Sequence, residues 1–535
     1  MESGTPLLLK DGFVVDGTGQ KGYTGNLLIK GEKIKQISRA PIDIQCETID
    51  CTGLVIAPGF IDAHSHMERY LALEGSEKLK TPFTAQGCTT FVTGNCGTSA
   101  AGFKKNTEFK HLIEAESHNI INMYWDSMAE YFSHLNKVGL SHNVVTLAGH
   151  GITQLSIRGL NPNPLDGDEL KELHALLEEA MDQGAAGVSF GLGYEPGMFF
   201  PLDEIKKIAC LVKKKDKILS VHGRVYAFLS GFYDKSDPTP HNVLSLQEMI
   251  DVAKETGVRM QYSHMILTGT KTHPTCEQCL DVIDQAIAEG VDIMTDTFPY
   301  HCGPSIINIM LPAWFLADIP ANYSNKEALA RAGHGLDNMP RNIGLGYEDI
   351  QLMNADSARF SSYQGLFIDE IADKLRIKPS RVILELSKIT DGKAPILTHQ
   401  YSSMKNIEDL IRHPACLFMT DSLVSAEGFQ NPGSFGAFPL FLQYARDRNL
   451  LSLEKAVHKM TGATAERFNI RDRGTLKEGL AADITVFDWE NVRDNNSIKE
   501  TDRAPTGIER VFINGRQVKK DGQVDVSIKA GVILT

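Results

Sequence analysis

A closely spaced pair of histidines is the first feature of this sequence that could do chemistry. His64 and His66 follow the mostly apolar run 57–63. Side chains two residues apart leave the same face of an extended strand, so both imidazoles can bind one metal ion. A pair of ordinary surface or core histidines is the alternative. The strand predicted before the pair favours the metal-binding interpretation.

Four more residues of metal-binding or proton-transfer type also end short apolar or β-branched runs: Cys96, His222, His264 and Asp421. Thiolate and imidazole are the ligands that zinc prefers, and a carboxylate can transfer protons. Each of these residues alone could be structural, and a lone cysteine usually is. Their shared position at strand ends is difficult to explain by packing, and it predicts a metal site with a carboxylate beside it.

A metal with a carboxylate beside it has the chemistry that hydrolysis, for example of an amide bond, can use. A zinc ion lowers the pKa of a bound water towards about 7 and polarises an amide carbonyl. Asp421 can accept the proton of the water and pass it to the leaving nitrogen. His150, which follows another short apolar run, either donates to the oxyanion or only packs the site.

The elements that position these residues follow from the pattern along the chain. Short β-branched or aromatic runs alternate with amphipathic stretches such as 168–183 and 245–256, which predicts parallel strands joined by crossover helices. Eight strands are what a closed (β/α)8 barrel of the TIM type needs, and the catalytic face of such a barrel lies at the C-terminal strand ends. The eight strand candidates end near His64, Cys96, His150, Gly191, His222, His264, Asp296 and Asp421.

Both chain ends have the texture of β-hairpins, with apolar runs separated by turn pairs such as Lys30-Gly31 and Asp521-Gly522. We therefore expect residues 1–57 and 471–535 to form one small β-sandwich, with the catalytic barrel spanning residues 58–470 between them. The irregular stretch 303–365 is predicted to be an insertion over the barrel mouth. The run 395–399 is a ninth strand candidate that the eight-strand count does not use.

Composition excludes several classes of partner. The 535 residues carry 54 basic and 67 acidic side chains, a net charge of -13, which argues against a nucleic-acid partner. Residues 1–20 lack a signal-peptide core, and no run reaches the roughly 18 apolar residues of a membrane span. We expect a cytoplasmic protein without a membrane partner.

The nine cysteines fit reduced thiols better than a disulfide framework, because they are odd in number and spread over the chain. Cys276 and Cys279, with His273 nearby, have the spacing of a zinc knuckle. The sequence offers no second pair, and residues 280–288 favour an amphipathic helix. A structural role is the preferred interpretation for these three residues.

The sequence resembles the N-acyl-D-amino-acid deacylase (D-aminoacylase) branch of the metal-dependent amidohydrolase superfamily. The resemblance covers almost the whole chain, and Asn95-Cys96-Gly97 and Tyr194 to Gly197 are specific to this branch. The matching segments are 58–66, 92–97, 149–150, 187–197, 299–300, 420–422, 459–462, and parts of the tail from 472 to 515.

The resemblance implies one tightly bound zinc and the residues that hold it. The implied zinc ligands are Cys96, His222 and His264. A second, weaker metal position would face His64, His66 and Asp421. Many relatives elsewhere in the superfamily bridge two metals with a carbamylated lysine, but the eight strand ends offer no lysine. Cys96 is the natural substitute, so one firmly held metal is favoured over two.

Two departures from the family bear on the substrate, a small amide. The family usually places a lysine where this chain has Ile266, and His-Pro-Arg where it has Asn431-Pro432-Gly433. Both changes remove cations from the expected position of a substrate carboxylate. The remaining candidates for substrate contact are Tyr194, Arg224, Ser305 and His150.

The preferred function is therefore metal-dependent hydrolysis of an amide C–N bond outside a peptide chain. A cyclic-amide hydrolase of the dihydroorotase or hydantoinase type is the alternative among enzymes. A catalytically inactive binding protein on the same scaffold is the alternative from another class, and the intact set of candidate ligands argues against it.

Overall fold

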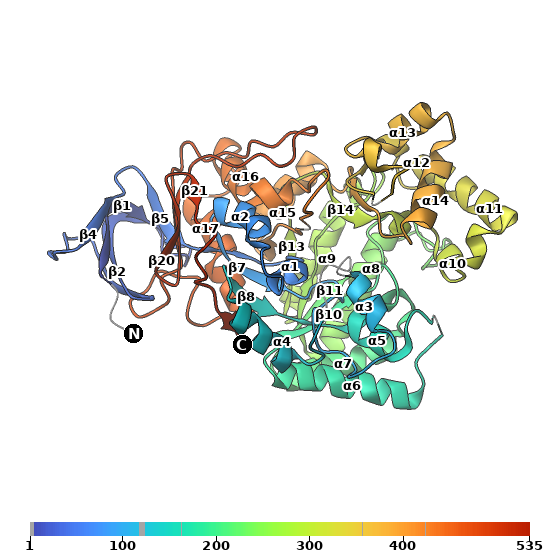
Figure 1. The fold of residues 1–535 in the computed structure, drawn as a ribbon, viewed down its shortest axis with the longest axis horizontal. Helices are drawn as coiled ribbons and strands as arrows, with labels where there is room; N and C mark the ends of the chain where they lie inside the picture. The colour runs from blue at the N-terminus through green and yellow to red at the C-terminus, as the bar shows by residue number, and fades with distance from the viewer. Residues whose placement is uncertain (1–4, 117–122, 162, 356, 423) are drawn as a thin grey trace.

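The structure is a computed structural model that describes residues 5–116, 123–161, 163–355, 357–422 and 424–535. Figure 1 shows three parts in a row: a β-sheet part at the N-terminal end, a central α/β part, and a helical part that contains α10 to α14. The chain is thus an α/β protein with several sheets. No helix within the described ranges is long and apolar enough to cross a membrane.

Parallel strands make up the central part. One six-stranded sheet has the order β17-β13-β12-β11-β10-β9. A second sheet has the order β22-β8-β7-β6, and its neighbouring strands are also parallel. Their bounds are β6 Phe60–Asp62, β7 Cys88–Thr93, β8 Asn143–Thr146, β9 Ala148–Gly149, β10 Gly187–Gly191, β11 Ile218–His222, β12 Arg259–Tyr262, β13 Ile293–Thr297, β17 Cys416–Phe418 and β22 Ile533–Leu534.

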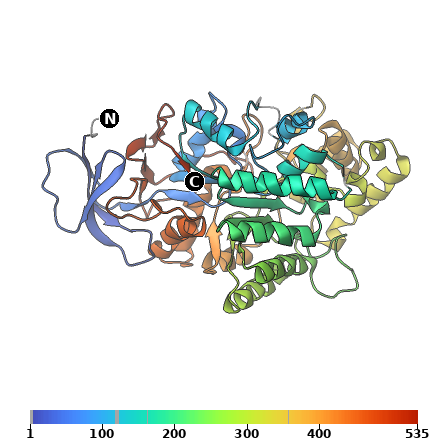
Figure 2. The same ribbon diagram turned by 90° about the horizontal axis from the view of Figure 1, so that it is seen from below.

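Helices cover these strands, as Figure 2 shows from below. Every residue of β10 and β11 is buried, as expected for parallel strands with side chains packed on both faces. The crossover helices begin at clear signals: the capping box of Asp166 and Glu169 starts α6. The helices are α1 Glu68–Leu71, α2 Glu77–Ala85, α3 Lys110–Glu116, α4 Met128–Val138, α5 His150–Arg158, α6 Gly167–Asp182, α7 Leu202–Lys214, α8 His241–Thr256, α9 Cys276–Ala288, α15 Met404–Arg412, α16 Gly433–Asp447, α17 Leu453–Met460 and α18 Gly462–Arg467.

The two sheets approach each other where β6 and β17 end. Ser65 and Ser422 form a parallel bridge just beyond these strands. The backbone N–H of Asp421 donates to the carbonyl of His64 at 3.1 Å, and that of His66 donates to the carbonyl of Ser422 at 3.2 Å. The edge strands of the two sheets, β6 and β17, are therefore neighbours at their C-terminal ends.

Strands from both chain ends form one nine-stranded sheet. The two ends meet where β5 pairs antiparallel with β18. Asn514 and Gly515 make the hairpin turn between β19 and β20. Their φ angles are 46° and 74°, and a two-residue type I′ turn requires positive φ at both positions. The strands are β1 Leu7–Val14, β2 Tyr23–Lys30, β3 Lys33–Ser38, β4 Glu47–Asp50, β5 Val55–Pro58, β18 Ile484–Phe487, β19 Ile508–Ile513, β20 Arg516–Lys520 and β21 Gln523–Val524.

The helical part is an insertion with its own sheet and core. Its three-stranded antiparallel sheet has the order β14-β16-β15. A separate apolar cluster, which runs from Ile307 to Ile396, fills the space between this sheet and the helices. The elements are β14 Gly303–Ile306, α10 Ala313–Leu316, α11 Lys326–Asp337, α12 Met339–Asn342, β15 Ile350–Leu352, α13 Ile368–Leu375, α14 Pro379–Ile389 and β16 Pro395–Thr398.

The insertion extends beyond its predicted end near Gly365. Strand β16 is the run that the eight-strand count left over, and it is the central strand of the insertion sheet. Ile371 on α13 and Val382 on α14 belong to the same apolar core as Ile396 on β16. The segment after Gly365 therefore belongs to the insertion, because the apolar faces of α13 and α14 pack in the insertion's core.

Candidate active site

The candidate ligands all lie at the C-terminal ends of central strands. His222 is the last residue of β11, and His264 lies two residues beyond β12. Cys96 and Asp421 each lie three residues beyond their strands, β7 and β17. His64 and His66 follow β6. Parallel strands bring these ends to one edge, so residues far apart in the sequence meet there.

Cys96 lies at the centre of a buried group of imidazoles. Its Sγ is 3.2 Å from His64 Nε2, 3.5 Å from His264 Nε2 and 3.8 Å from His222 Nδ1. His222 Nδ1 and His264 Nε2 are 2.8 Å apart. The ligand atoms of His64, Cys96 and His264 all lie within 4.8 Å of one another, a spacing that one ion can bridge. One thiol and several imidazoles form a donor set that suits zinc.

Asp421 forms a second group with the histidine pair. Its Oδ1 lies 3.5 Å from His64 Nε2 and 3.6 Å from His66 Nε2. These three residues also form a set of potential ligands within 4.8 Å of one another. His64 therefore belongs to both groups, and the structure brings all six predicted residues into one site.

Three site residues have a left-handed backbone, which is rare for residues other than glycine. The φ angles of Cys96, His264 and Asp421 are 55°, 28° and 47°. Such conformations cost about 1–3 kcal/mol each and gather at functional sites, where the surrounding structure enforces them. The sharp turns that they make just beyond the strands bring three of the candidate ligands together.

Burial sets the protonation of the site. Desolvation lowers the pKa values of His64, His222 and His264 below the ordinary value for histidine. The imidazoles are therefore neutral near pH 7, which is the form that ligates a metal. Desolvation also raises the pKa of the Cys96 thiol. Binding of a metal would remove the proton of that thiol.

Asp62 joins the two strands that carry the histidine pair and Asp421. Its Oδ1 accepts from the backbone N–H of His64 at 3.3 Å and from that of Thr420 at 3.0 Å. Its Oδ2 accepts from the Thr420 hydroxyl at 2.6 Å. Burial raises the pKa of Asp62 to about 7. This carboxyl fixes the separation between His64 and Asp421.

Two further carboxyl groups support the histidines. Glu68, which is buried, lies 3.2 Å from His66 Nδ1 and accepts from the Thr98 hydroxyl at 3.2 Å. Asp296 accepts from the backbone N–H of His264 at 2.6 Å and from Gln261 Nε2 at 2.7 Å. Burial raises the pKa of Asp296 to about 7. Glu68 can therefore hold the His66 ring in orientation, as carboxylates beside ligating histidines do, whereas Asp296 fixes the backbone of His264.

Sequence reasoning did not assign roles to Asp62, Glu68 or Asp296. A signal was present for two of them: Asp62 precedes His64 by two residues, and Glu68 follows His66 by two. Asp296 was expected only as the end of a strand. Its function as an acceptor for His264 depends on a contact between β12 and β13 that only the fold makes.

Tyr194 and Ser305 differ in their distance from the metal ligands. The Tyr194 hydroxyl donates to the carbonyl of Cys96 at 2.8 Å, and its ring meets that of His222 edge-on with centroids 4.8 Å apart. Ser305 lies on β14, opposite Ile396 in the insertion sheet. Tyr194 therefore borders the ligand group, whereas Ser305 belongs to the insertion.

Arg224 is held by partners outside the ligand group. Its Nε lies 3.0 and 3.1 Å from the two carboxylate oxygens of Glu248. Its two Nη atoms donate to the carbonyls of Met198 at 3.0 Å and Phe200 at 2.9 Å. The charge of Arg224 is thus neutralised by Glu248, and its donors fix the segment after Tyr194.

His150 is buried at the start of α5 between two aromatic rings. Its ring centroid lies 4.3 Å from that of Phe190 and 4.2 Å from that of Phe200. Burial lowers its pKa to about 3. Neither ring nitrogen has a hydrogen-bond partner among the residues that the structure describes.

The zinc-knuckle spacing does not produce a ligand group in the described part of the chain. Cys276 and Cys279 are buried on α9, and Cys279 Sγ accepts from Asn242 Nδ2 at 3.4 Å. His273 Nε2 lies 3.2 Å from the carbonyl of Gln400. These contacts are structural, in agreement with the preferred interpretation of this pair.

Comparison with known proteins agrees with this geometry. The model of the amidohydrolase family matches residues 47–197 and 404–519, which contain His64, His66, Cys96 and Asp421. The D-aminoacylase of Alcaligenes xylosoxydans xylosoxydans is 27% identical over 532 residues, with 99% of this chain and 97% of the relative covered. The chain belongs to the amidohydrolase family. The N-acyl-D-glutamate deacylase of the same organism is 28% identical, with 96% of this chain and 94% of the relative covered.

Solved amidohydrolase structures share the fold over the whole chain. A D-aminoacylase crystal structure superposes with a TM-score of 0.81 at 24% identity and covers 99% of both chains. An N-acyl-D-glutamate deacylase from Bordetella bronchiseptica, complexed with zinc and a phosphonate inhibitor that mimics the tetrahedral intermediate, gives 0.80 at 24% identity with the same coverage. A dihydropyrimidinase from Brevibacillus agri gives 0.57 at 14% identity.

Proposed function

We propose that this amidohydrolase is a zinc-dependent deacylase that hydrolyses the amide bond of a small N-acylated amino compound. One observation carries the proposal: Asp421 Oδ1 lies 3.5 and 3.6 Å from the Nε2 atoms of His64 and His66, beside the buried Cys96 group. A carboxylate next to a zinc-type donor set provides the proton transfer and the Lewis acid that metal-dependent hydrolysis of an amide uses.

The residues present fit a zinc ion. We assign the tightly bound ion to Cys96, His222 and His264, and a second, weaker position to His64, His66 and Asp421. The buried thiol and the neutral imidazoles support this assignment, because zinc prefers such donors. A zinc ion bound there supplies Lewis-acid chemistry, which acidifies water and polarises a carbonyl.

Asp421 is the proposed proton shuttle. Its carboxylate takes a proton from the attacking water and delivers that proton to the nitrogen of the departing amine. Delivery of the proton is needed because an unprotonated amine is a poor leaving group. The backbone N–H of Asp421, which donates to the carbonyl of His64 at 3.1 Å, keeps the carboxylate beside the histidine pair.

We also infer that the central strands close into a (β/α)8 barrel, and that residues 1–57 and 471–535 form one accessory domain beside it, apart from β22, which pairs with β8 of the central part. The bridge between Ser65 and Ser422 supports closure between β6 and β17. The pairing of β5 with β18 supports a single accessory domain. The nine free thiols support a reducing, cytoplasmic location.

The substrate we propose lacks a free carboxylate beside the amide. Ile266 is buried where the family usually has a lysine. A Cβ atom on Gly433 would lie 2.6 Å from the carbonyl oxygen of Thr420, so this backbone leaves no room for the arginine of relatives. Two other cations nearby have partners: Arg224 pairs with Glu248, and Lys271 Nζ donates to the carbonyl of Arg341.

A substrate panel tests the proposed function. Zinc-loaded enzyme would be incubated with N-acyl-D-amino acids, their L-forms, neutral N-acyl amides and cyclic amides, and amine release or ring opening would be measured. The expected result is amine release from the acyclic compounds and no ring opening. Ring opening alone would assign the chain to the cyclic-amide hydrolases instead. No turnover of any compound would favour a binding protein.

A further inference from the structure

We propose that His301, Cys302 and His399 form a second site for a zinc-type metal ion, separate from the active site. The ligand atoms of these three residues lie within 4.8 Å of one another. The site shares no residue with the Cys96 group or the Asp421 group. It also goes beyond the proposed hydrolysis, which uses neither the thiol of Cys302 nor the two imidazoles.

The insertion sheet brings the three residues together. Gly303 at the start of β14 pairs with Thr398 at the end of β16. Cys302 and His399 come next on the two antiparallel strands, so they are cross-strand neighbours whose side chains share one face. The two backbones stay close beyond the strands, where the left-handed Gln400 shifts the register and the N–H of Tyr401 donates to the carbonyl of His301 at 2.9 Å. His301 Nε2 then lies 3.4 Å from His399 Nδ1.

A hydrogen-bond chain fixes the tautomer of His399. Gln351 Nε2 donates to the carbonyl of Gly365 at 2.8 Å, which leaves the Gln351 Oε1 atom to face His399. This Oε1 atom lies 2.9 Å from His399 Nε2, which must therefore carry the proton. The lone pair of His399 is consequently on Nδ1, directed towards His301. An amide or carbonyl that holds the second nitrogen of a histidine is a typical partner of a metal ligand.

The donor set and its exposure fit a bound ion that can enter from solvent. One thiol and two imidazoles are ligands that zinc prefers, and three protein ligands leave a fourth position open. Cys302 and His399 are buried, whereas His301 is exposed at the edge of the group. A metal can reach the thiol from the side of His301.

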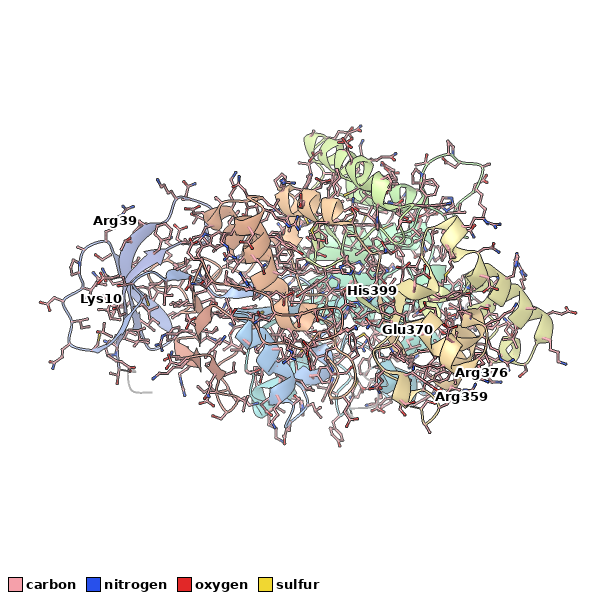
Figure 3. The ribbon with its side chains drawn as sticks, turned by 90° about the horizontal axis from the view of Figure 1, so that it is seen from above. Lys10, Arg39, Arg359, Glu370, Arg376 and His399 are labelled. Carbon is pink, nitrogen blue, oxygen red and sulfur yellow. The ribbon has the colours of Figure 1, made fainter. Side chains whose placement is uncertain are left out.

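The position of this group gives the ion a structural effect. Strands β14 and β16 are the segments through which the chain enters and leaves the insertion. Figure 3 shows His399 on the side of the insertion nearest the central part, with Arg359 and Arg376 farther out. An ion held by Cys302, just before β14, and His399, just after β16, ties the two strands together. Binding should therefore stabilise the insertion on the central part of the molecule.

Metal stoichiometry tests the proposal. Purified full-length protein would be equilibrated with zinc by dialysis, and bound zinc would be counted by elemental analysis for wild type, Cys302→Ser, Cys96→Ser and Cys416→Ser. Cys416 is a buried thiol on β17 outside both ligand groups, so its variant is the matched control. Cys302→Ser should bind one zinc fewer than either wild type or Cys416→Ser. Cys96→Ser should retain the zinc held by His301, Cys302 and His399.

The exposed ligand provides a variant that should fold normally. His301→Ala should weaken the zinc of this site by at least about tenfold, since loss of even an outer-shell partner costs roughly that much. It should also abolish the rise in melting temperature that this zinc produces, without altering the zinc held by Cys96. Equal zinc binding by wild type, Cys302→Ser and His301→Ala would overturn the proposal, as would the absence of any zinc in Cys96→Ser.

Discussion

Asn431 holds the backbone of Asp421 in place. Its Nδ2 donates to the carbonyl of Asp421 at 3.1 Å, and its Oδ1 accepts from the backbone N–H of Gly433 at 3.0 Å. Asp421 has a left-handed backbone with φ of 47°, so its conformation depends on such external partners. Asn431 is therefore a positioning residue for the proposed proton shuttle.

Replacement of Asn431 should lower kcat and leave bound zinc unchanged. A net hydrogen bond contributes about 0.5–1.5 kcal/mol, so Asn431→Ala should cost up to roughly tenfold in kcat. Asn431→Asp keeps an acceptor for Gly433 but loses the donor to Asp421, so it should be impaired as well. Steady-state kinetics with zinc analysis would measure both effects. Wild-type kcat in Asn431→Asp would contradict this role.

Asp421→Asn should retain the tightly bound zinc and lose most of kcat. General acid–base groups contribute typically 10²–10⁴-fold, so a decrease of at least about a hundredfold is expected. Asp409→Asn is the control, because Asp409 lies on α15 and forms ion pairs with Lys405 and Arg412 on the same helix. Near-normal turnover of Asp421→Asn would assign the proton transfer to another residue.

Cys96→Ser should bind its zinc much more weakly than wild type. The loss should exceed the roughly tenfold to hundredfold that removal of an outer-shell partner costs, because the thiolate is a direct ligand. Cys279→Ser is a matched control on α9, where the thiol contacts Asn242. Competition with a chelator would give both affinities. Equal affinities for the two variants would show that Cys96 does not hold the ion.

Ile266→Lys should shift the substrate preference towards free N-acyl amino acids. A charge-assisted hydrogen bond is worth about 1.5–3 kcal/mol, which corresponds to roughly tenfold or more in kcat/KM for the acids. Ile266→Met controls for the change of shape at this buried position. The wild type should use neutral N-acyl amides at least as well as the acids. A strong wild-type preference for the acids, unchanged by the lysine, would place the carboxylate on another group.

Much of the candidate site could be predicted because its ligands end strands. Parallel strands align their C-terminal ends, so His64, Cys96, His222 and Asp421 could be placed together from their local patterns alone. The partner of Arg224 could not be predicted in this way. Arg224 was a candidate for substrate contact, whereas Glu248 on α8 and two backbone carbonyls hold it. Pairing between side chains of different helices and strands depends on tertiary packing, which the local sequence pattern does not predict.

The extent of the insertion had a similar limit. The run 395–398 has the apolar and β-branched character of a central strand, and short buried runs of this kind look alike in any sheet. Only its pairing with β14 and β15 assigns it to the insertion. The supporting carboxyls Asp62 and Asp296 illustrate the same point, because their acceptor roles arise from contacts between strands.

Zinc-dependent hydrolysis can be tested by titrating metal-free enzyme with zinc and measuring amine release from the best N-acyl substrate at each step. The proposed site predicts almost no release without metal, and a rise that follows occupancy of the site containing Cys96. The same titration of Cys96→Ser should require far more zinc. Full activity in metal-free enzyme, or release that does not change as zinc is added, would contradict the assignment of this chain as a zinc-dependent deacylase.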